Sequence, residues 1–438
     1  MADLSCDFAG IRSPNPFWIA SGPPSNTAHQ AHRAFEAGWG GVVWKTIGQP
    51  IVNVSSRYSA MDFGSQRMVG FNNIELITDR SAEANFREIA EVKRRWPEHA
   101  VIASLMLESR EEWREFIARA TDAGADGLEL NYGCPHGMCE RGMGSAVGQQ
   151  PAVLERITGW AMEFARIPVI VKLTPNITDI TMSARAARRA GANAISLINT
   201  INSITNVDLD SFVPEPRVGS LSAHGGYCGP AVKPIALNMV QCCAGDPEVG
   251  LPISGIGGIS SWRDAAEFIA LGAGSVQVCT AVMHYGFRIV HAMKEGLNEY
   301  LDSKGMTGLD DLRGRAVARV VPWETLDLSF KRVARIDHAT CIGCNLCYAA
   351  CEDGAHQCID LVDPDSIGAG LGPGRVPFKA IPKVREHDCV GCNLCACVCP
   401  VDGCIEMHEV ATGSPPMSWE QYQSRLVNGE VPPIPPHA

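Results

Sequence analysis

The sequence predicts an α/β protein, namely a (β/α)8 TIM barrel followed by a small cysteine-rich domain. Three observations support this prediction. Short apolar segments alternate with longer helical segments over the first two thirds of the chain. Polar residues follow most of the apolar segments, and eleven of the 18 cysteines lie between Cys341 and Cys404. Because 438 residues are many for one hydrophobic core, we expect two or more domains.

The eight apolar segments are the expected strands of the barrel. They are short, rich in Val, Ile or Ala and almost continuously hydrophobic, which is typical of parallel strands buried on both faces. They comprise residues 17–20, 42–45, 101–105, 127–131, 168–173, 194–199, 252–257 and 275–279. Helical segments lie between most of them, among them 110–123, 152–165, 180–190 and 262–271. Eight such alternations favour a closed barrel, with a doubly wound sheet as the alternative on this pattern alone.

The remaining segments set the expected domain boundaries. Residues 53–77 do not fit a βα repeat, and we expect a loop inserted at the catalytic face after the second strand. The tail contains Ser-Pro-Pro and Pro-Pro-Ile-Pro-Pro and is not expected to form a regular core. The expected division is a barrel at 1–312, a connector at 313–334, a ferredoxin-like domain at 335–410 and a Pro-rich tail at 411–438.

The cysteines near the C-terminus form two copies of the spacing C-x2-C-x2-C-x3-C. The first run is Cys341, Cys344, Cys347 and Cys351, and the second is Cys389, Cys392, Cys395 and Cys399. Such runs hold a pair of [4Fe–4S] clusters, with the fourth cysteine of each run ligating the other cluster. The alternatives are zinc or disulfides, but zinc sites favour two CxxC pairs. The motif therefore predicts one-electron transfer and redox chemistry.

The other cysteines follow no metal spacing. Cys139, Cys228, Cys242 and Cys243 are interpreted as structural, and Cys358, Cys397 and Cys404 as core packing within the cluster domain.

Composition narrows the classes of protein. With 46% hydrophobic and 19% charged residues the chain is an ordinary globular one, without an apolar run that could span a bilayer. The first residues lack the features of a signal peptide, and cysteines at metal spacing indicate a reducing compartment. A formal net charge of −11 gives no reason to expect nucleic acid or an anionic membrane as partner. We therefore expect a cytoplasmic enzyme.

In a TIM barrel, chemistry takes place at the C-terminal ends of the strands. Two lysines, Lys45 and Lys172, stand at such ends, and together they favour an anionic cofactor. Lysines at the surface with solvated ammonium groups are the alternative. Glycines after the last strands would let backbone N–H groups cradle a phosphate. The polar and glycine residues at the strand ends are Ser21, Lys45, Thr46, Asn131, Lys172, Asn199, Thr200, Gly229, Gly257, Gly258, Cys279 and Thr280.

Three stretches carry a resemblance to a known family. They are NIELI at 73–77, NYGCPHGMCERGM at 131–143 and KLTPNITDI at 172–180. This combination resembles the dihydroorotate dehydrogenase family of flavin barrels, and within it the pyrimidine-reducing members that carry a C-terminal iron–sulfur domain. The likeness covers roughly residues 5–410. It implies reduction of the C5–C6 double bond of uracil or thymine.

The resemblance also implies cofactors, ligands and partners. FMN would contact Ser21, Lys45, Thr46, Lys172, Gly229, Ile256, Gly257, Gly258, Cys279 and Thr280. Substrate would contact Asn73, Glu75, Asn131, His136, Asn199 and Thr200. The chain shows no FAD- or dinucleotide-binding module, so NAD(P)H and FAD would act through a partner, an NAD(P)H-oxidising FAD/iron–sulfur flavoprotein subunit. A homodimer within a heterotetramer is implied.

The implied reaction needs a hydride on one carbon and a proton on the other. We expect Cys134 to be the general acid, because a thiol with an ordinary pKa of about 8.5 is mostly protonated at pH 7. A buried structural thiol is the alternative, and His136 is expected to orient the loop rather than to relay protons. Asparagine amides offer both a donor and an acceptor to an imide. Tyr132-Gly133 stands where the animal member of the family has Leu-Ser, which affects the expected substrate preference and proton relay.

Two other functions stay open on the sequence. One is a dihydroorotate dehydrogenase-type oxidoreductase that passes electrons in the opposite direction. The other is a non-catalytic iron–sulfur electron-transfer subunit with a degenerate barrel, although Lys45, Lys172 and Cys134 are intact. Assays with uracil, thymine and dihydroorotate distinguish the pyrimidine reductase from the dihydroorotate dehydrogenase. Flavin bands in an absorbance spectrum distinguish a flavin enzyme from the electron-transfer subunit.

Overall fold

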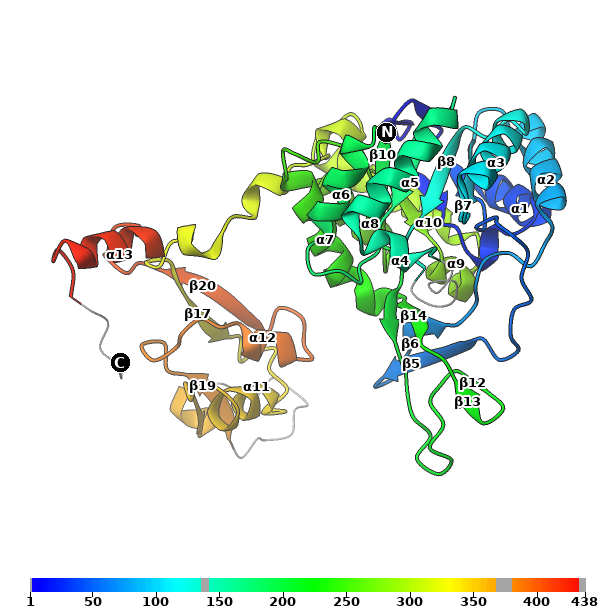
Figure 1. Ribbon diagram of the computed structural model, residues 1–438. Helices are drawn as coiled ribbons and strands as arrows, with labels where there is room; N and C mark the ends of the chain where they lie inside the picture. Colours follow the sequence, from blue (N-terminus) through cyan, green and yellow to red (C-terminus); the bar gives the residue numbers. More distant parts are fainter. Residues whose placement is uncertain (1, 135–141, 368–379, 433–438) are drawn as a thin grey trace. The chain divides into compact units, whose positions relative to one another are not determined.

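The computed structural model describes residues 2–134, 142–367 and 380–432. The chain divides into two compact units, Met1–Val320 and Val321–Ala438 (Figure 1). Each unit is described by itself.

The first unit confirms the predicted barrel. Its closed sheet has eight parallel strands within the described residues, and all eight overlap the expected segments. In chain order these strands are β3 (Phe17–Ile19), β4 (Gly41–Val43), β7 (Ala100–Leu105), β8 (Gly127–Asn131), β9 (Val169–Lys172), β10 (Ala194–Leu197), β15 (Ile253–Ile256) and β16 (Ala273–Val278). The barrel closes where Val276 of β16 pairs with Phe17 of β3. A doubly wound sheet would have left two open edges.

Helices cover the outside of the barrel (Figure 1). In the described residues they are α1 (Ala28–Ala37), α2 (Ala82–Arg95), α3 (Arg110–Asp122), α5 (Pro151–Phe164), α6 (Ile180–Arg189), α7 (Lys233–Gly245), α8 (Trp262–Ala270) and α10 (Ile289–Ser303), with short α4 (Ser145–Gly148) and α9 (Thr280–Tyr285). Side-chain caps fix several starting points. Ser109 and Ser261 accept backbone hydrogen bonds at the third position of α3 and α8 and form capping boxes there. These caps let the βα connections stay short.

The core of this unit is aromatic and aliphatic. Trp18, Trp39, Trp44 and Trp113 are almost completely buried between the sheet and its helices. A small hairpin of β1 (Cys6–Phe8) and β2 (Ile11–Ser13) packs its apolar side chains onto the same core. This packing makes the strand ends a rigid frame for the polar groups that follow them.

The expected loop at 53–77 is wrong for most of that stretch. Residues Tyr58–Phe63 (β5) and Gln66–Asn73 (β6) form a hairpin, with Gly64 in the left-handed region at the turn. This hairpin joins β14 (Gly225–Cys228) and β11 (Ile201–Ser203) in an antiparallel sheet of order β11-β14-β6-β5 (Figure 1). A further short hairpin pairs β12 (Arg217–Val218) with β13 (Leu221–Ser222). We call the four-stranded sheet the insertion sheet.

The second unit is built from two paired ribbons. Strand β17 (Lys331–Ile336) pairs with β20 (Ile405–Val410), and β18 (Ile359–Val362) pairs with β19 (Ile381–Val384). Its short helices are α11 (Leu346–Tyr348) and α12 (Leu394–Val398). Much of its core consists of cysteine side chains, which is unusual for a small domain without a metal centre.

The tail contains a helix, although the sequence predicted no regular core there. Helix α13 (Trp419–Val427) starts at a Ser418 capping box. Trp419 stacks on Tyr422, with 5.5 Å between ring centroids, and lies 6.2 Å from Trp323. Aromatic contacts with the segment before β17 therefore hold this part of the tail.

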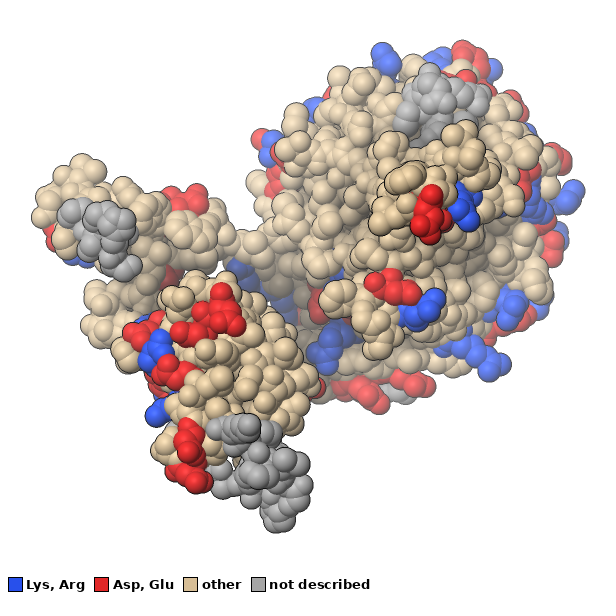
Figure 2. All heavy atoms as spheres, turned by 90° about the horizontal axis from the view of Figure 1, so that it is seen from below, with Lys and Arg blue, Asp and Glu red and all other residues tan. Residues whose placement is uncertain are grey.

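The surface and helix lengths bear on possible partners. On the described part of the face in Figure 2, Lys and Arg side chains stand among Asp and Glu and do not form a continuous basic surface. Among the described residues, every helix is too short or too polar to cross a membrane.

Candidate functional site

A hollow of about 1280 Å³, open solvent at its mouth included, lies at the C-terminal ends of the barrel strands. All the described residues that the sequence predicted for cofactor, substrate and acid lie along its wall. They are Ser21, Lys45, Thr46, Asn73, Glu75, Asn131, Cys134, Lys172, Asn199, Thr200, Gly229, Ile256, Gly257, Gly258, Cys279 and Thr280. His136 lies outside the described residues. The fold thus brings segments from the whole barrel to one place, while the roles of these residues stay predictions.

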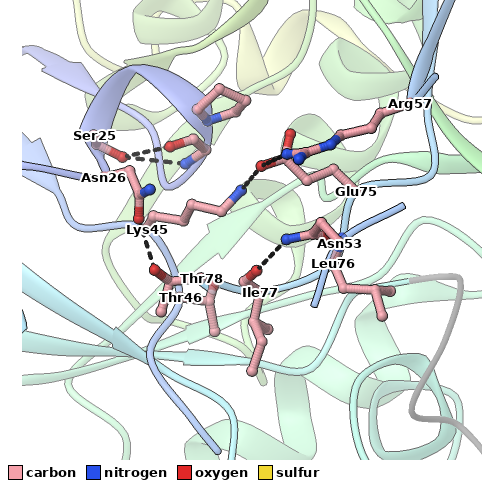
Figure 3. Close-up of polar contacts among 12 residues, drawn as sticks. Ser25, Asn26, Lys45, Thr46, Asn53, Arg57, Glu75, Leu76, Ile77 and Thr78 are labelled. Carbon is pink, nitrogen blue, oxygen red and sulfur yellow. Dashed lines mark hydrogen bonds and ion pairs between the residues drawn. The ribbon is translucent and has the colours of Figure 1, made fainter. Parts of the chain in front are cut away.

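Lys45 forms a buried ion pair at the floor of this hollow. Its Nζ lies 2.5 Å from Oε1 of Glu75, and both side chains are less than 10% exposed. Figure 3 shows Lys45 and Arg57 converging on the Glu75 carboxylate, with Arg57 Nη1 3.6 Å from the same oxygen. Tyr58 donates a hydrogen bond to the other oxygen, and burial together with this bond raises the pKa of Tyr58. Lys45 from the end of the barrel strand β4, Arg57, and Tyr58 of the insertion sheet thus hold the Glu75 carboxylate from three sides.

Lys172 has a buried carboxylate partner as well. Its Nζ lies 3.4 Å from Oε1 of Glu129, whose side chain is completely buried. The alternative of surface lysines is thus wrong, because Lys45 and Lys172 are only 4% and 5% exposed. Each lysine brings its positive charge to the hollow together with a nearby negative charge, which lessens the attraction for an anion.

Hydroxyl and amide groups form a continuous chain across the mouth of the barrel. Thr46 Oγ1 lies 3.1 Å from Ser21 Oγ and accepts a 2.9 Å hydrogen bond from Asn131 Nδ2. Asn199 Nδ2 donates to Asn131 Oδ1 at 2.9 Å, and Asn199 Oδ1 accepts from the backbone of Thr200. The orientations of both amides are therefore set before any ligand binds.

Three glycines after the last strands form a backbone cradle. Gly229, Gly257 and Gly258 all have positive φ angles, of 91°, 129° and 77°. A Cβ atom on Gly257 would lie 2.7 Å from Ala236 Cβ, and one on Gly258 would lie 2.9 Å from the Lys233 backbone nitrogen. Only glycine fits here, so backbone N–H groups can reach a ligand directly. This donor set fits a phosphate group such as that of FMN.

Cys134 follows β8 and is 9% exposed. It packs with Ile77, Met106 and Met143 in a small apolar cluster of its own. The residue before it has no room for a side chain, because a Cβ atom on Gly133 would lie 2.4 Å from Asn199 Cβ. A side chain at residue 133 would therefore displace Asn199 in this chain.

Two further thiols line the hollow. Cys228 was interpreted as structural, but it faces the hollow and accepts a 3.2 Å hydrogen bond from Thr280 Oγ1. Burial raises the pKa of Cys228 to about 11 and that of Cys279 to about 12. Both thiols are therefore neutral at physiological pH and poor nucleophiles.

Sequence reasoning missed several residues around the hollow. Tyr58, Phe71 and Tyr227 come from the insertion sheet and add aromatic surface to its wall. No local pattern points to them, because residues 53–77 predict a loop and not paired strands. Glu129 and Gln277 could have been found from the sequence, because each is a polar residue at an inward position of an otherwise apolar strand.

The second unit gathers the cysteines into two smaller hollows. The first is lined by Cys341, Cys344, Cys347 and Cys399, and the second by Cys351, Cys389, Cys392 and Cys395. These are the two crossed sets that the spacing predicted. Cys404 joins the first set and Cys358 the second, so these two thiols lie beside the predicted ligands. Four thiolates around one space fit a [4Fe–4S] cluster. Among the described residues, no three Cys, His, Asp or Glu side chains are grouped closely enough to hold a single metal ion.

The fold and site define an oxidoreductase that combines a TIM barrel with an iron–sulfur domain. The family model for dihydroorotate dehydrogenase matches residues 3–301, and that for a 4Fe-4S dicluster domain matches residues 334–407. The chain belongs to the dihydroorotate dehydrogenase family and is, within it, an enzyme of the dihydropyrimidine dehydrogenase group.

Three relatives illustrate the range of this family. The chain is 42% identical over 360 residues to the NAD-dependent dihydropyrimidine dehydrogenase subunit PreA of Escherichia coli K12. The aligned region covers 82% of this chain and 87% of the relative. It is 40% identical over 328 residues to the chloroplastic dihydropyrimidine dehydrogenase (NADP(+)) of Arabidopsis thaliana, covering 72% and 77%. It is 35% identical over 314 residues to the catalytic subunit of dihydroorotate dehydrogenase B (NAD(+)) of Pyrococcus horikoshii, covering 72% and 98%.

Proposed function

We propose that this chain reduces the C5–C6 double bond of uracil or thymine to the 5,6-dihydropyrimidine, the first step of reductive pyrimidine catabolism. The observation that carries this proposal is the single hollow that brings Cys134 together with the strand-end lysines, asparagines and glycines. Bound FMN would supply the hydride, and the protein must supply orientation and the second hydrogen as a proton.

The chain offers suitable groups for FMN. The cradle of Gly229, Gly257 and Gly258 suits its phosphate, with Cys279 and Thr280 beside it on the wall of the hollow. Lys45 and Lys172 are buried ammonium groups at the floor, where they can stabilise negative charge on the ring system. Because the two lysines are each paired with a glutamate, the phosphate depends on backbone N–H groups more than on lysine charge.

The asparagines suit a neutral cyclic imide. Uracil and thymine have alternating C=O and N–H groups around part of the ring, and an amide side chain can donate a hydrogen bond to the first and accept one from the second. Asn131 and Asn199 hold each other in one orientation, and Asn73 is anchored by donating a 3.0 Å hydrogen bond to the carbonyl of Gly226. Groups that are already oriented cost little entropy when the substrate binds.

Cys134 is the proposed proton donor. As hydride reaches one carbon of the double bond, the electron pair of the π bond moves to the other carbon and takes the thiol proton, which leaves a thiolate. Solvent then returns a proton to Cys134. Ile77, Met106 and Met143 shield the thiol, so water competes less as a proton donor during the step.

The second unit would deliver the electrons. The two crossed cysteine sets support two [4Fe–4S] clusters, which carry single electrons toward the barrel. The Escherichia coli relative is named a subunit of an NAD-dependent enzyme, which supports a partner subunit. We include in the proposal that this partner oxidises NAD(P)H through FAD and its own iron–sulfur centres. We include in the proposal a homodimer within a heterotetramer and a cytoplasmic location.

A Cys134→Ala variant tests the proposal. The purified variant is supplied with a chemical reductant and assayed for dihydrouracil and dihydrothymine, and its FMN content is measured. Loss of turnover with FMN retained supports the acid role, whereas near-normal turnover rejects it. If the wild-type protein acts only on dihydroorotate, it is a dihydroorotate dehydrogenase. If the wild-type protein binds no flavin, it is an electron-transfer subunit.

A further inference from the structure

Glu129 is a glutamate in the interior of the barrel. It lies in the middle of β8, between Leu128 and Leu130, and its side chain is completely buried. The interiors of such barrels are usually filled with branched apolar side chains, and an ionised carboxylate there is costly unless it is paired and hydrogen-bonded. A buried charge that lowers the free energy of unfolding in this way is expected to have a specific function.

Side chains from other strands fix the orientation of this carboxylate. Its Oε2 accepts hydrogen bonds from Ser196 Oγ on β10 at 2.9 Å and from Gln277 Nε2 on β16 at 3.1 Å. Gln277 Nε2 also lies 3.2 Å from Ser254 Oγ, which in turn accepts from Ser275. Two strands, β10 and β16, thus hold one oxygen of Glu129 directly and β15 supports Gln277 from behind, while the other oxygen faces Lys172.

The second oxygen has a single charged neighbour in the described part of the chain. Oε1 lies 3.4 Å from Lys172 Nζ and makes no hydrogen bond among the described residues. Lys172 and Gln277 line the hollow, but Glu129 does not. Because residues two apart on a strand share a face, Glu129 lies one layer below Asn131, which does line the hollow. Glu129 can therefore act on a ligand only indirectly, through Lys172 or through Gln277.

This arrangement differs from that of the other lysine. The partner of Lys45 is Glu75, which lines the hollow and can contact a ligand itself. The partner of Lys172 does not line the hollow, and its charged contact there is with the ammonium group, which it holds and whose charge it offsets. A reduced flavin carries more negative charge than an oxidised one, and an uncompensated cation beside it would stabilise the reduced form.

We propose that Glu129 is a positioning residue, the buried counter-charge that holds Lys172 at the floor of the hollow and lowers the reduction potential of the bound flavin. The inference rests on the proposed flavin site. A lower potential makes the reduced cofactor a better hydride donor to the pyrimidine.

The test is to measure the reduction potential of FMN bound to the full-length protein. The flavin absorbance is recorded as the potential of the solution is changed. Glu129→Gln is expected to raise the potential, because it removes a negative charge next to Lys172. Lys172→Met is expected to lower it, and the double variant is expected to return toward the wild type. Ser275→Ala is the matched control, since it perturbs the same buried layer without changing a charge, and it is expected to leave the potential in place.

The outcomes separate the inference from the proposed function. Wild-type protein without FMN rejects the proposed function itself. Wild-type and Glu129→Gln proteins that both bind FMN at the same potential overturn only the inference. If Glu129→Gln does not fold, the double variant decides. A folded double variant that binds FMN shows that the glutamate is needed only opposite the lysine, whereas failure of both assigns Glu129 to core packing and overturns the proposal.

Discussion

Single residues decide how closely the polar groups of the hollow approach one another. Gly133 has no side chain, and this allows Asn199 to reach Asn131 directly after β8. The next residue is Cys134, so the same short segment sets the position of the proposed acid. A steric change at residue 133 should therefore affect catalysis more than folding.

We expect Gly133→Ser to reduce kcat/KM for uracil by about 10- to 100-fold, because Asn199 must move away from the new Cβ atom. Steady-state kinetics measure this effect. Gly159→Ser is the matched control, since a Cβ atom at that glycine of α5 meets nothing within 4 Å, and its kinetics should match the wild type. Full activity of Gly133→Ser would contradict the described packing.

At the scale of elements, helix α8 shows how one cap supports the glycine cradle, the proposed phosphate site. Ser261 and Asp264 form its capping box, and Lys233 Nζ lies 2.6 Å from Asp264 Oδ1. Burial would raise the pKa of Asp264, but the hydrogen bonds from Lys233, Ser260 and Ser261 outweigh it and hold the pKa below its usual value. Lys233 also packs directly against Gly258.

We expect Asp264→Asn to destabilise the protein at pH 7 by about 1–3 kcal/mol, since a charged hydrogen-bond acceptor is lost. A carboxylate with a lowered folded-state pKa stabilises the fold above its unfolded value of about 3.9, and this contribution disappears as the pH falls through the folded-state pKa. Denaturant unfolding should thus show a constant difference from wild type between about pH 5 and 8 that closes below about pH 4. A difference that persists at low pH would contradict this assignment.

Patterns within one element were predictable, and contacts between distant elements were not. The strands that end near Lys45 and Lys172 and the two cysteine runs follow from local spacing, whereas the crossing of the runs was predicted from the known dicluster motif. On the side away from its hairpin, Asn73 pairs with Gly226 of β14, about 150 residues further along the chain, and no local pattern predicts this pairing. Likewise, the carboxylate partners of the two lysines come from other segments, Glu75 from just after β6 and Glu129 from the neighbouring strand β8, so the local sequence around each lysine did not indicate them.

At the scale of the whole molecule, the proposed electron transfer depends on cysteines from both runs meeting in each of the two hollows of the second unit. Cys399 belongs to the second run but lies with Cys341, Cys344 and Cys347. Cys351 makes the reciprocal crossing. The crossing ties the two halves of the second unit together through the proposed clusters.

Paired substitutions test this crossing by iron content and by the EPR signals of the reduced clusters. Cys399→Ser with Cys341→Ser should lose about half of the iron, because both changes damage one cluster. Cys399→Ser with Cys389→Ser should lose nearly all of it. Cys397→Ser, two residues away and outside both hollows, is the control. The reverse pattern would show that each run holds its own cluster.

The most direct test of the whole account is a single turnover without the partner. The full-length protein is reduced anaerobically, freed of reductant and mixed with uracil while the flavin absorbance is followed. We predict that the flavin band returns as dihydrouracil forms. A flavin that stays reduced with uracil and thymine but is reoxidised by orotate would contradict the account.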